Sequence, residues 1–166
     1  MAKRKEENLQ KERMKVGNIW HLVSELHKFR ITFSVTLTTL AGFTLTAGTI
    51  DSRIILPLIG IFLLSSGSAA FNEYQERDKD ALMERTRKRP IPSGRIKPGT
   101  VLAIALLEII IGTFLVYAGG GFIAALLGFT AFIWYNVIYT PLKKISPFAV
   151  IPGSVIGAIP PMVGWV

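Results

Sequence analysis

The residues best suited to chemistry in this sequence lie between positions 71 and 99. Asn72, Glu76 and Asp80 recur there at intervals of four, so on a helix their side chains share one face over about 12 Å. Such oxygen ligands suit a hard cation, and Mg²⁺ is usually held by one or two carboxylates together with substrate phosphate oxygens. The spacing therefore predicts that Glu76 and Asp80 bind a metal ion beside Asn72.

A strongly basic loop follows this row of side chains. Pro90, Pro92 and Gly94 end the helical pattern and predict a loop. The basic residues around them are Arg85, Arg87, Lys88, Arg89 and Arg95. Because guanidinium groups bind phosphate oxygens in a bidentate manner, carboxylates followed by such a loop are typical of a site for a metal-bound diphosphate.

Tyr139 and Lys143 form a second candidate pair. They lie one helical turn apart, and a phenol and an ammonium group are suitable donors to a departing phosphate oxygen. The alternative interpretation of the whole region is an ordinary charged loop whose acids pair with its bases. The register of three oxygen-bearing residues directly before the basic loop favours the site.

The composition indicates a membrane protein. Of the 166 residues, 50% are hydrophobic and 18% are charged, whereas charged residues make up about a quarter of ordinary soluble domains. Hydrophobicity this high excludes a disordered chain. The absence of cysteine excludes disulfides, thiolate metal sites and thiol nucleophiles.

Apolar stretches predict an all-α, polytopic membrane helix bundle with about five transmembrane helices. The stretches cover residues 31–49, 54–70, 100–118, 122–139 and 147–166. A helix of about 19 residues is about 28 Å long, close to the hydrocarbon thickness, and the glycines at 119–121 predict a turn. We expect a basic cytoplasmic tail over 1–16, an interfacial amphipathic helix over 17–30 and the bundle over 31–166, with a cytoplasmic site loop over 71–99.

The basic residues predict which loops face the cytoplasm. Of the 19 lysines and arginines, all except Arg53 fall in the first 30 residues, in the loop 71–99, or at Lys143 and Lys144. Short loops rich in Lys and Arg stay cytoplasmic, so we expect a multi-pass protein of the inner (plasma) membrane with a cytoplasmic N-terminus. Because topology accounts for the net charge of +8, we expect no nucleic-acid partner.

The region after Phe71 resembles a known family. Asn72, Glu76 and Asp80 are similar to the first acidic motif of the UbiA superfamily of intramembrane aromatic prenyltransferases, Asn-x-x-x-Asp-x-x-x-Asp, with Glu at the middle position. The likeness is closer to the protoheme IX farnesyltransferase, or heme O synthase, branch. The segment Met83 to Pro90 resembles that branch's Met-x-Arg-Thr-x-x-Arg-Pro motif, and residues 139–161 resemble a later stretch of it.

This resemblance implies a nine-helix bundle in which farnesyl diphosphate, activated by Mg²⁺, alkylates a vinyl group of heme b to give heme O. It implies that Asn72, Glu76 and Asp80 hold Mg²⁺ and diphosphate. It further implies that Arg85, Lys88 and Arg89 bind diphosphate oxygens, while Tyr139 and Lys143 assist the leaving group. The expected partners are therefore farnesyl diphosphate, heme b and the lipid bilayer; no oligomeric state follows.

The family's second acidic motif lies on the sixth helix, and the sequence ends before it, inside apolar text. We therefore expect a fragment that carries part of the metal site. Two alternatives stay open: a UbiA-type enzyme with a quinone or other lipid acceptor, and a catalytically inactive membrane fragment. The first acidic motif is common to the superfamily, so the segments after it favour the heme branch.

Three further ionisable residues lie outside these motifs. Glu108 falls inside the third apolar stretch, where an acid is a candidate functional residue, although an acid that is protonated or bonded to a neighbouring helix is the more frequent situation. His21 and His27 lie on the amphipathic segment. They are conceivable axial ligands of a heme, but a surface position is the more frequent situation for such histidines.

Overall fold

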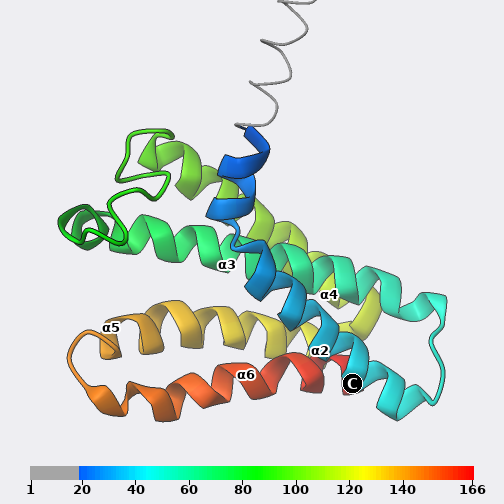
Figure 1. Ribbon diagram of the computed structural model, residues 1–166. Coiled ribbons are helices and arrows are strands. Elements are labelled where there is room, and N and C mark those ends of the chain that lie inside the picture. The colour runs from blue at the N-terminus through cyan, green and yellow to red at the C-terminus, as the bar shows by residue number, and fades with distance from the viewer. Residues whose placement is uncertain (1–18) are drawn as a thin grey trace, which may run out of the picture.

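The computed structural model describes residues 19–166, which form helices and connecting loops without a strand. The main helices are preceded by a short helix over residues 19–26. The elements that follow are α2 (Phe29–Ala47), η1 (Ser52–Ile54), α3 (Ile55–Leu82), α4 (Pro98–Ile133), the π-helix η2 (Trp134–Tyr139), α5 (Thr140–Leu142), η3 (Pro147–Ala149) and α6 (Val150–Trp165) (Figure 1). The predicted tail over 1–16 lies outside the described residues.

Helix α4 consists of two legs that meet at Gly121. This residue has φ 80° and ψ −174°, which is not helical, and a positive φ of this size is readily adopted only by glycine. Figure 1 shows the chain reversing its direction there, so that the second leg runs back along the bundle toward α5. The predicted turn at the three glycines is confirmed.

The predicted helix bundle is confirmed. Three helical stretches are long and apolar enough to cross a membrane, namely Ser52–Leu82, Pro98–Leu142 and Pro147–Trp165, and the second of these contains both legs of α4. Helix α2 has 19 residues and is rich in threonine. Its threonine hydroxyls donate to carbonyls one turn earlier, as Thr36 does to Thr32 and Thr44 to Leu40, which satisfies these polar groups within the helix.

Small residues bring the helices close together. At Gly112 an added Cβ would lie 2.6 Å from the backbone nitrogen of Leu64, so α4 and α3 pack backbone against backbone. Gly42 of α2 similarly contacts the backbone of Pro161 in α6. Close packing of this kind is typical of helices in membranes, where lipid supplies no hydrophobic drive for association.

The N-terminal segment departs from the continuous helix predicted over 17–30. The first helix ends at residue 26 and α2 begins at Phe29, with Lys28 between them in a left-handed conformation (φ 48°, ψ 52°). Leu26 is buried in a cluster with Ala70 of α3 and Ile91 of the loop after it. The break occurs because tertiary packing turns Leu26 into the protein, which a single amphipathic helix along the surface would not allow. The interfacial location of this segment stays a prediction.

Candidate functional site

Helix α3 carries the predicted row of polar residues on one face, and each member has its own partner. Asn72 is 1% exposed, and its Nδ2 donates to Oγ1 of Thr140 over 2.8 Å. A second buried amide, Asn136 of η2, donates to Oγ of Ser68 over 2.7 Å. These two bonds hold α3 against the end of the second α4 leg and α5, so residues far apart in sequence form one site.

Glu76 lies next to Lys143, one member of the predicted pair of Tyr139 and Lys143. Its Oε2 lies 3.0 Å from Nζ of Lys143, and its Oε1 lies 3.6 Å from Nζ of Lys144. The Lys143 ammonium is 5.7 Å from the ring centroid of Tyr139. Tyr139 in turn stacks on Tyr135, with ring centroids 5.8 Å apart. The structure thus places Tyr139 and Lys143 beside the α3 row.

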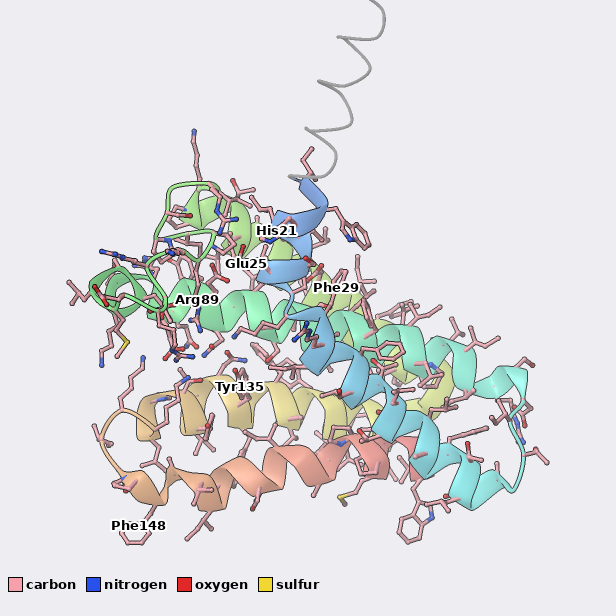
Figure 2. The ribbon with its side chains drawn as sticks, viewed as in Figure 1. His21, Glu25, Phe29, Arg89, Tyr135 and Phe148 are labelled. Atoms are coloured by element: carbon pink, nitrogen blue, oxygen red, sulfur yellow. The ribbon has the colours of Figure 1, made fainter. Side chains whose placement is uncertain are left out.

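Asp80 pairs with the basic loop. Its Oδ2 lies 2.6 Å from Nη1 of Arg89, and Asp80 itself is buried. The hydroxyl of Thr86 donates to the carbonyl of Asp80 over 3.0 Å, which binds one of the carbonyls at the C-terminal end of α3. Figure 2 shows nitrogen and oxygen atoms gathered between Arg89 and Tyr135. The loop therefore folds back over the helix that carries the carboxylates.

Two predicted residues are not brought to the carboxylates. Arg85 and Lys88 are both exposed, and among the described residues neither side chain forms an ion pair with an acid. Arg95 extends instead across the loop, where its Nη2 lies 2.8 Å from Oε2 of Glu25 and also donates to the carbonyl of Lys88. The alternation of basic residues along a loop does not indicate which of them turn inward.

Sequence reasoning missed two ionisable residues here, one buried and one partly buried. Glu73 is 1% exposed and accepts a hydrogen bond from the backbone nitrogen of Ile91 over 3.3 Å, which anchors the loop. Lys28 donates to Oδ1 of Asn72 over 3.4 Å. Burial lowers the pKa of Lys28, and the positive charge of Arg89 adds to this effect. Helical periodicity could not identify Lys28, because this residue reaches the site from a turn between two helices.

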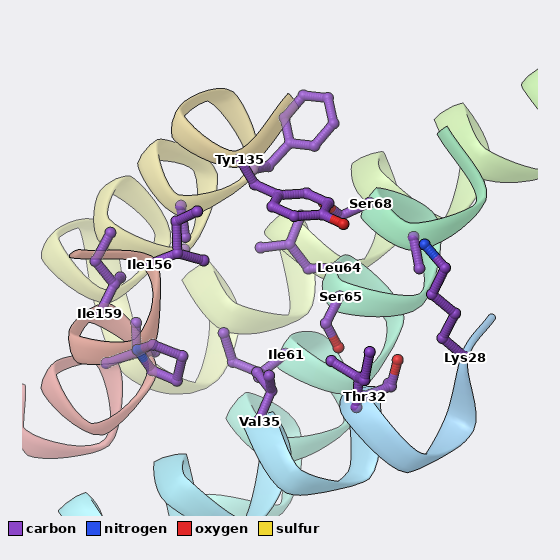
Figure 3. A pocket seen from close by; sticks show the side chains of 17 residues that line it. Lys28, Thr32, Val35, Ile61, Leu64, Ser65, Ser68, Tyr135, Ile156 and Ile159 are labelled. Atoms are coloured by element: carbon purple, nitrogen blue, oxygen red, sulfur yellow. The ribbon is translucent and has the colours of Figure 1, made fainter. Parts of the chain in front are cut away.

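An apolar cavity of about 230 Å³ opens beside this polar cluster. It is lined by α2, α3, the second leg of α4 and α6. Figure 3 shows the nitrogen of Lys28 and the hydroxyl of Tyr135 at one end, while Val35 and Ile61 lie away from them. The arrangement suits an amphiphilic ligand with a charged head at the α3 row and an apolar chain in the cavity.

The family comparison agrees with this geometry. The UbiA prenyltransferase family matches residues 35–166. The chain belongs to the UbiA prenyltransferase family. No solved structure gives a significant match.

Several curated relatives of this UbiA chain share one name. It is 44% identical over 126 residues to the protoheme IX farnesyltransferase of Geobacter sulfurreducens, covering 75% of this chain and 46% of the relative. It is 37% identical to that of Oleidesulfovibrio alaskensis, covering 86% and 50%. Protoheme IX farnesyltransferase 1 of Pseudomonas entomophila is also 37% identical, covering 95% and 53%. The chain therefore spans about half the length of these relatives.

The oxygen-bearing side chains on α3 of this UbiA chain suit a hard cation whose remaining coordination positions are filled by the substrate. Glu76 and Asp80 offer two carboxylates on one helix face, and each is now paired with a cation. Within residues 19–166 no group of three or more His, Cys, Asp or Glu side chains is arranged to bind a metal. Two carboxylates with the remaining ligands from phosphate and water match the usual coordination of Mg²⁺.

The histidines and Glu108 have structural partners. Nε2 of His27 lies 3.0 Å from Oε1 of Glu108, and Nδ1 of His27 lies 2.8 Å from the carbonyl of Val23. Burial lowers the pKa of His27, but the hydrogen bond and charge of Glu108 outweigh it, so the pKa is raised. His27 is buried, with Nδ1 within hydrogen-bond distance of Val23 and Nε2 within ion-pair distance of Glu108, whereas His21 is exposed. Glu108 thus pairs with a neighbouring segment, one of the roles expected for it.

Proposed function

We propose that this protein transfers a farnesyl group from farnesyl diphosphate to a vinyl group of heme b in a Mg²⁺-dependent reaction that yields heme O. The observation that carries the proposal is the row of α3 side chains, which meets Arg89 on one side and Lys143 on the other at the mouth of an apolar cavity. The names of the relatives support the same reaction. Because the chain spans about half their length, this site would be one part of the complete one.

The chemistry of the described residues suits the loss of a diphosphate leaving group. When Mg²⁺ is bound by Glu76 and Asp80, it supplies positive charge that stabilises the departing diphosphate. Arg89 and Lys143, released from these carboxylates, would then donate to phosphate oxygens. Tyr139, whose ring lies beside the Lys143 ammonium, would donate a further hydrogen bond. Cleavage of the carbon–oxygen bond releases diphosphate and leaves an allylic cation, which the electron-rich vinyl group attacks. Water then adds to the resulting cation on the heme side chain and loses a proton, which gives the hydroxyl group of heme O.

The same arrangement supports a cytoplasmic site in the plasma membrane. The loop after α3 and the loop that holds Lys143 and Lys144 lie at one end of the bundle, while the loop with Arg53 and the turn at Gly121 lie at the other (Figure 1). Segregation of basic residues to one end is what the positive-inside rule requires. We propose that the end with the basic loops faces the cytoplasm.

The test is a product assay on membranes that contain the protein as its gene encodes it. Heme b, farnesyl diphosphate and Mg²⁺ are supplied, and heme O is identified by its mass. We expect product from the wild type, and at least a hundredfold less from Asp80→Asn, because the exchange removes charge from the metal site. Asp78→Asn is the matched control, since Asp78 is exposed on the same helix.

Equal product from Asp80→Asn and the wild type would remove the site assignment. Prenylation of a quinone precursor without any heme O would favour the alternative acceptor. Absence of every product, with the protein folded in the membrane, would favour the inactive alternative.

A further inference from the structure

We propose that Lys28 binds the phosphate group that carries the prenyl chain, and thereby distinguishes an allylic diphosphate ester from free diphosphate. The inference rests on the proposed function and assigns a specific task to a residue outside the acidic and basic motifs. Lys28 is a substrate-binding residue in this proposal, contacting the donor at the boundary between its charged head and its apolar chain.

The backbone around Lys28 is held in an uncommon conformation. Lys28 is the one residue other than glycine with a positive φ in the described part of the chain. Its neighbours fix the turn: Leu26 and His27 are buried, His27 is bonded to Glu108, and the hydroxyl of Thr32 donates to the carbonyl of His27 over 2.8 Å. Strained conformations persist where the surroundings over-determine them, and they concentrate at ligand sites. The turn directs the Lys28 side chain toward α3.

The Lys28 ammonium has no carboxylate partner within residues 19–166. Its single hydrogen bond goes to the amide oxygen of Asn72 at 3.4 Å, while Glu76 and Asp80 pair with other cations. Arg89 and Lys143 contribute positive charge around it, while Glu73 and Glu76 contribute negative charge without forming an ion pair with Lys28. A partly buried ammonium without a directly bonded counter-ion is costly. An anionic group of a ligand would provide that counter-ion.

The position of Lys28 indicates which anionic group this is. Lys28 lines the apolar cavity and also contacts Asn72, the member of the α3 row closest to that cavity. The row continues for about 12 Å from Asn72 to Asp80, which is enough for a diphosphate and its metal ion. A donor with its chain in the cavity would therefore place its ester phosphate at Lys28 and Asn72, and its terminal phosphate toward Asp80 and Arg89.

The inference is tested by binding, with no turnover required. The probe is farnesyl thiodiphosphate, a stable analogue of the donor, titrated with Mg²⁺ into the protein as its gene encodes it in lipid nanodiscs. Lys28→Met keeps the length of the side chain and removes its charge. We expect the analogue to bind about 10- to 100-fold more weakly, as is usual for a lost charged hydrogen bond. The affinity of the same variant for inorganic diphosphate should fall by less than about threefold.

Two variants serve as controls. Lys79→Met removes an exposed lysine of α3 and should bind the analogue like the wild type. Lys28→Arg keeps the charge and should recover most of the affinity. If Lys28→Met does not fold, as judged by thermal unfolding, Lys28→Gln replaces it, because an uncharged amide keeps a polar contact to Asn72; the same loss is expected.

The outcomes separate this inference from the proposed function. If the wild type does not bind the analogue, the proposed function fails. If the wild type binds it and the uncharged variant binds it within twofold, the function stands and the role of Lys28 is wrong. A variant that loses affinity for heme b but keeps affinity for the analogue would also overturn the inference, because Lys28 would then serve a heme carboxylate.

Discussion

The ion pair between Asp80 and Arg89 predicts that Arg89 competes with a metal ion for the Asp80 carboxylate. Oδ2 of Asp80 and Nη1 of Arg89 are 2.6 Å apart, so a metal ion must displace the guanidinium before it reaches this oxygen. Arg89→Gln removes the competing cation. We therefore expect the variant to bind Mg²⁺ more tightly when no diphosphate is present, and to bind diphosphate with Mg²⁺ more weakly.

The magnitude follows from the geometry of the pair. A hydrogen bond to a charged group contributes about 1.5 to 3 kcal/mol, and the side chains of Asp80 and Arg89 are 7% and 24% exposed. Solvent near Arg89 screens part of the interaction, so the lower end, about 1.5 kcal/mol, is appropriate. Since about 1.4 kcal/mol corresponds to a factor of ten, we expect roughly tenfold tighter binding of the metal alone.

The assay measures free Mn²⁺, a paramagnetic substitute for Mg²⁺, by electron paramagnetic resonance during a titration of the protein in detergent. Arg53→Gln is the control, because Arg53 forms a pair of the same 2.6 Å length with Asp51 at the exposed opposite end of the bundle. That variant should leave metal affinity unchanged. Metal affinity that is unchanged or weaker in Arg89→Gln, with the fold intact, would refute the competition between guanidinium and metal.

Two further predictions concern stability in detergent. Gly112→Val places a side chain where even a Cβ meets the backbone of α3, so we expect a loss of about 1 to 3 kcal/mol in the free energy of unfolding. Gly99→Ala is the control, because open space surrounds Gly99, and it should change this free energy by less than about 0.5 kcal/mol. Equal thermal midpoints for the two variants would contradict the close packing. The second prediction concerns His27, whose pKa is raised above 6.5 by Glu108. The contribution of protonated His27 to the free energy of unfolding is therefore complete below about pH 6.5, and it is lost as the pH rises through the higher pKa of the folded state. His27→Gln should flatten this part of the stability profile between pH 6 and 9, and an unchanged slope would show that His27 is not its source.

Much of the site was accessible from local spacing. The interval of four between Asn72, Glu76 and Asp80 predicted a shared helix face, and α3 continues to Leu82 as this requires. The spacing of Tyr139 and Lys143 indicated a second candidate pair, and the family resemblance implied that this pair assists the same leaving group. The binding roles of all these residues stay predictions, as do the Mg²⁺ requirement and the membrane orientation.

The sequence by itself determined the long helices, the turn at Gly121 and the polar row on α3, because helical periodicity, chain-breaking residues and hydropathy act over a few neighbouring positions. Only the tertiary structure decided which basic side chains reach that row. It turned Arg89 inward and left Arg85 exposed, although both occupy the same basic loop, and it brought Lys28 to Asn72 across 44 positions. The reason is that the direction of a loop side chain depends on how distant helices pack together, and local spacing carries no information about that packing.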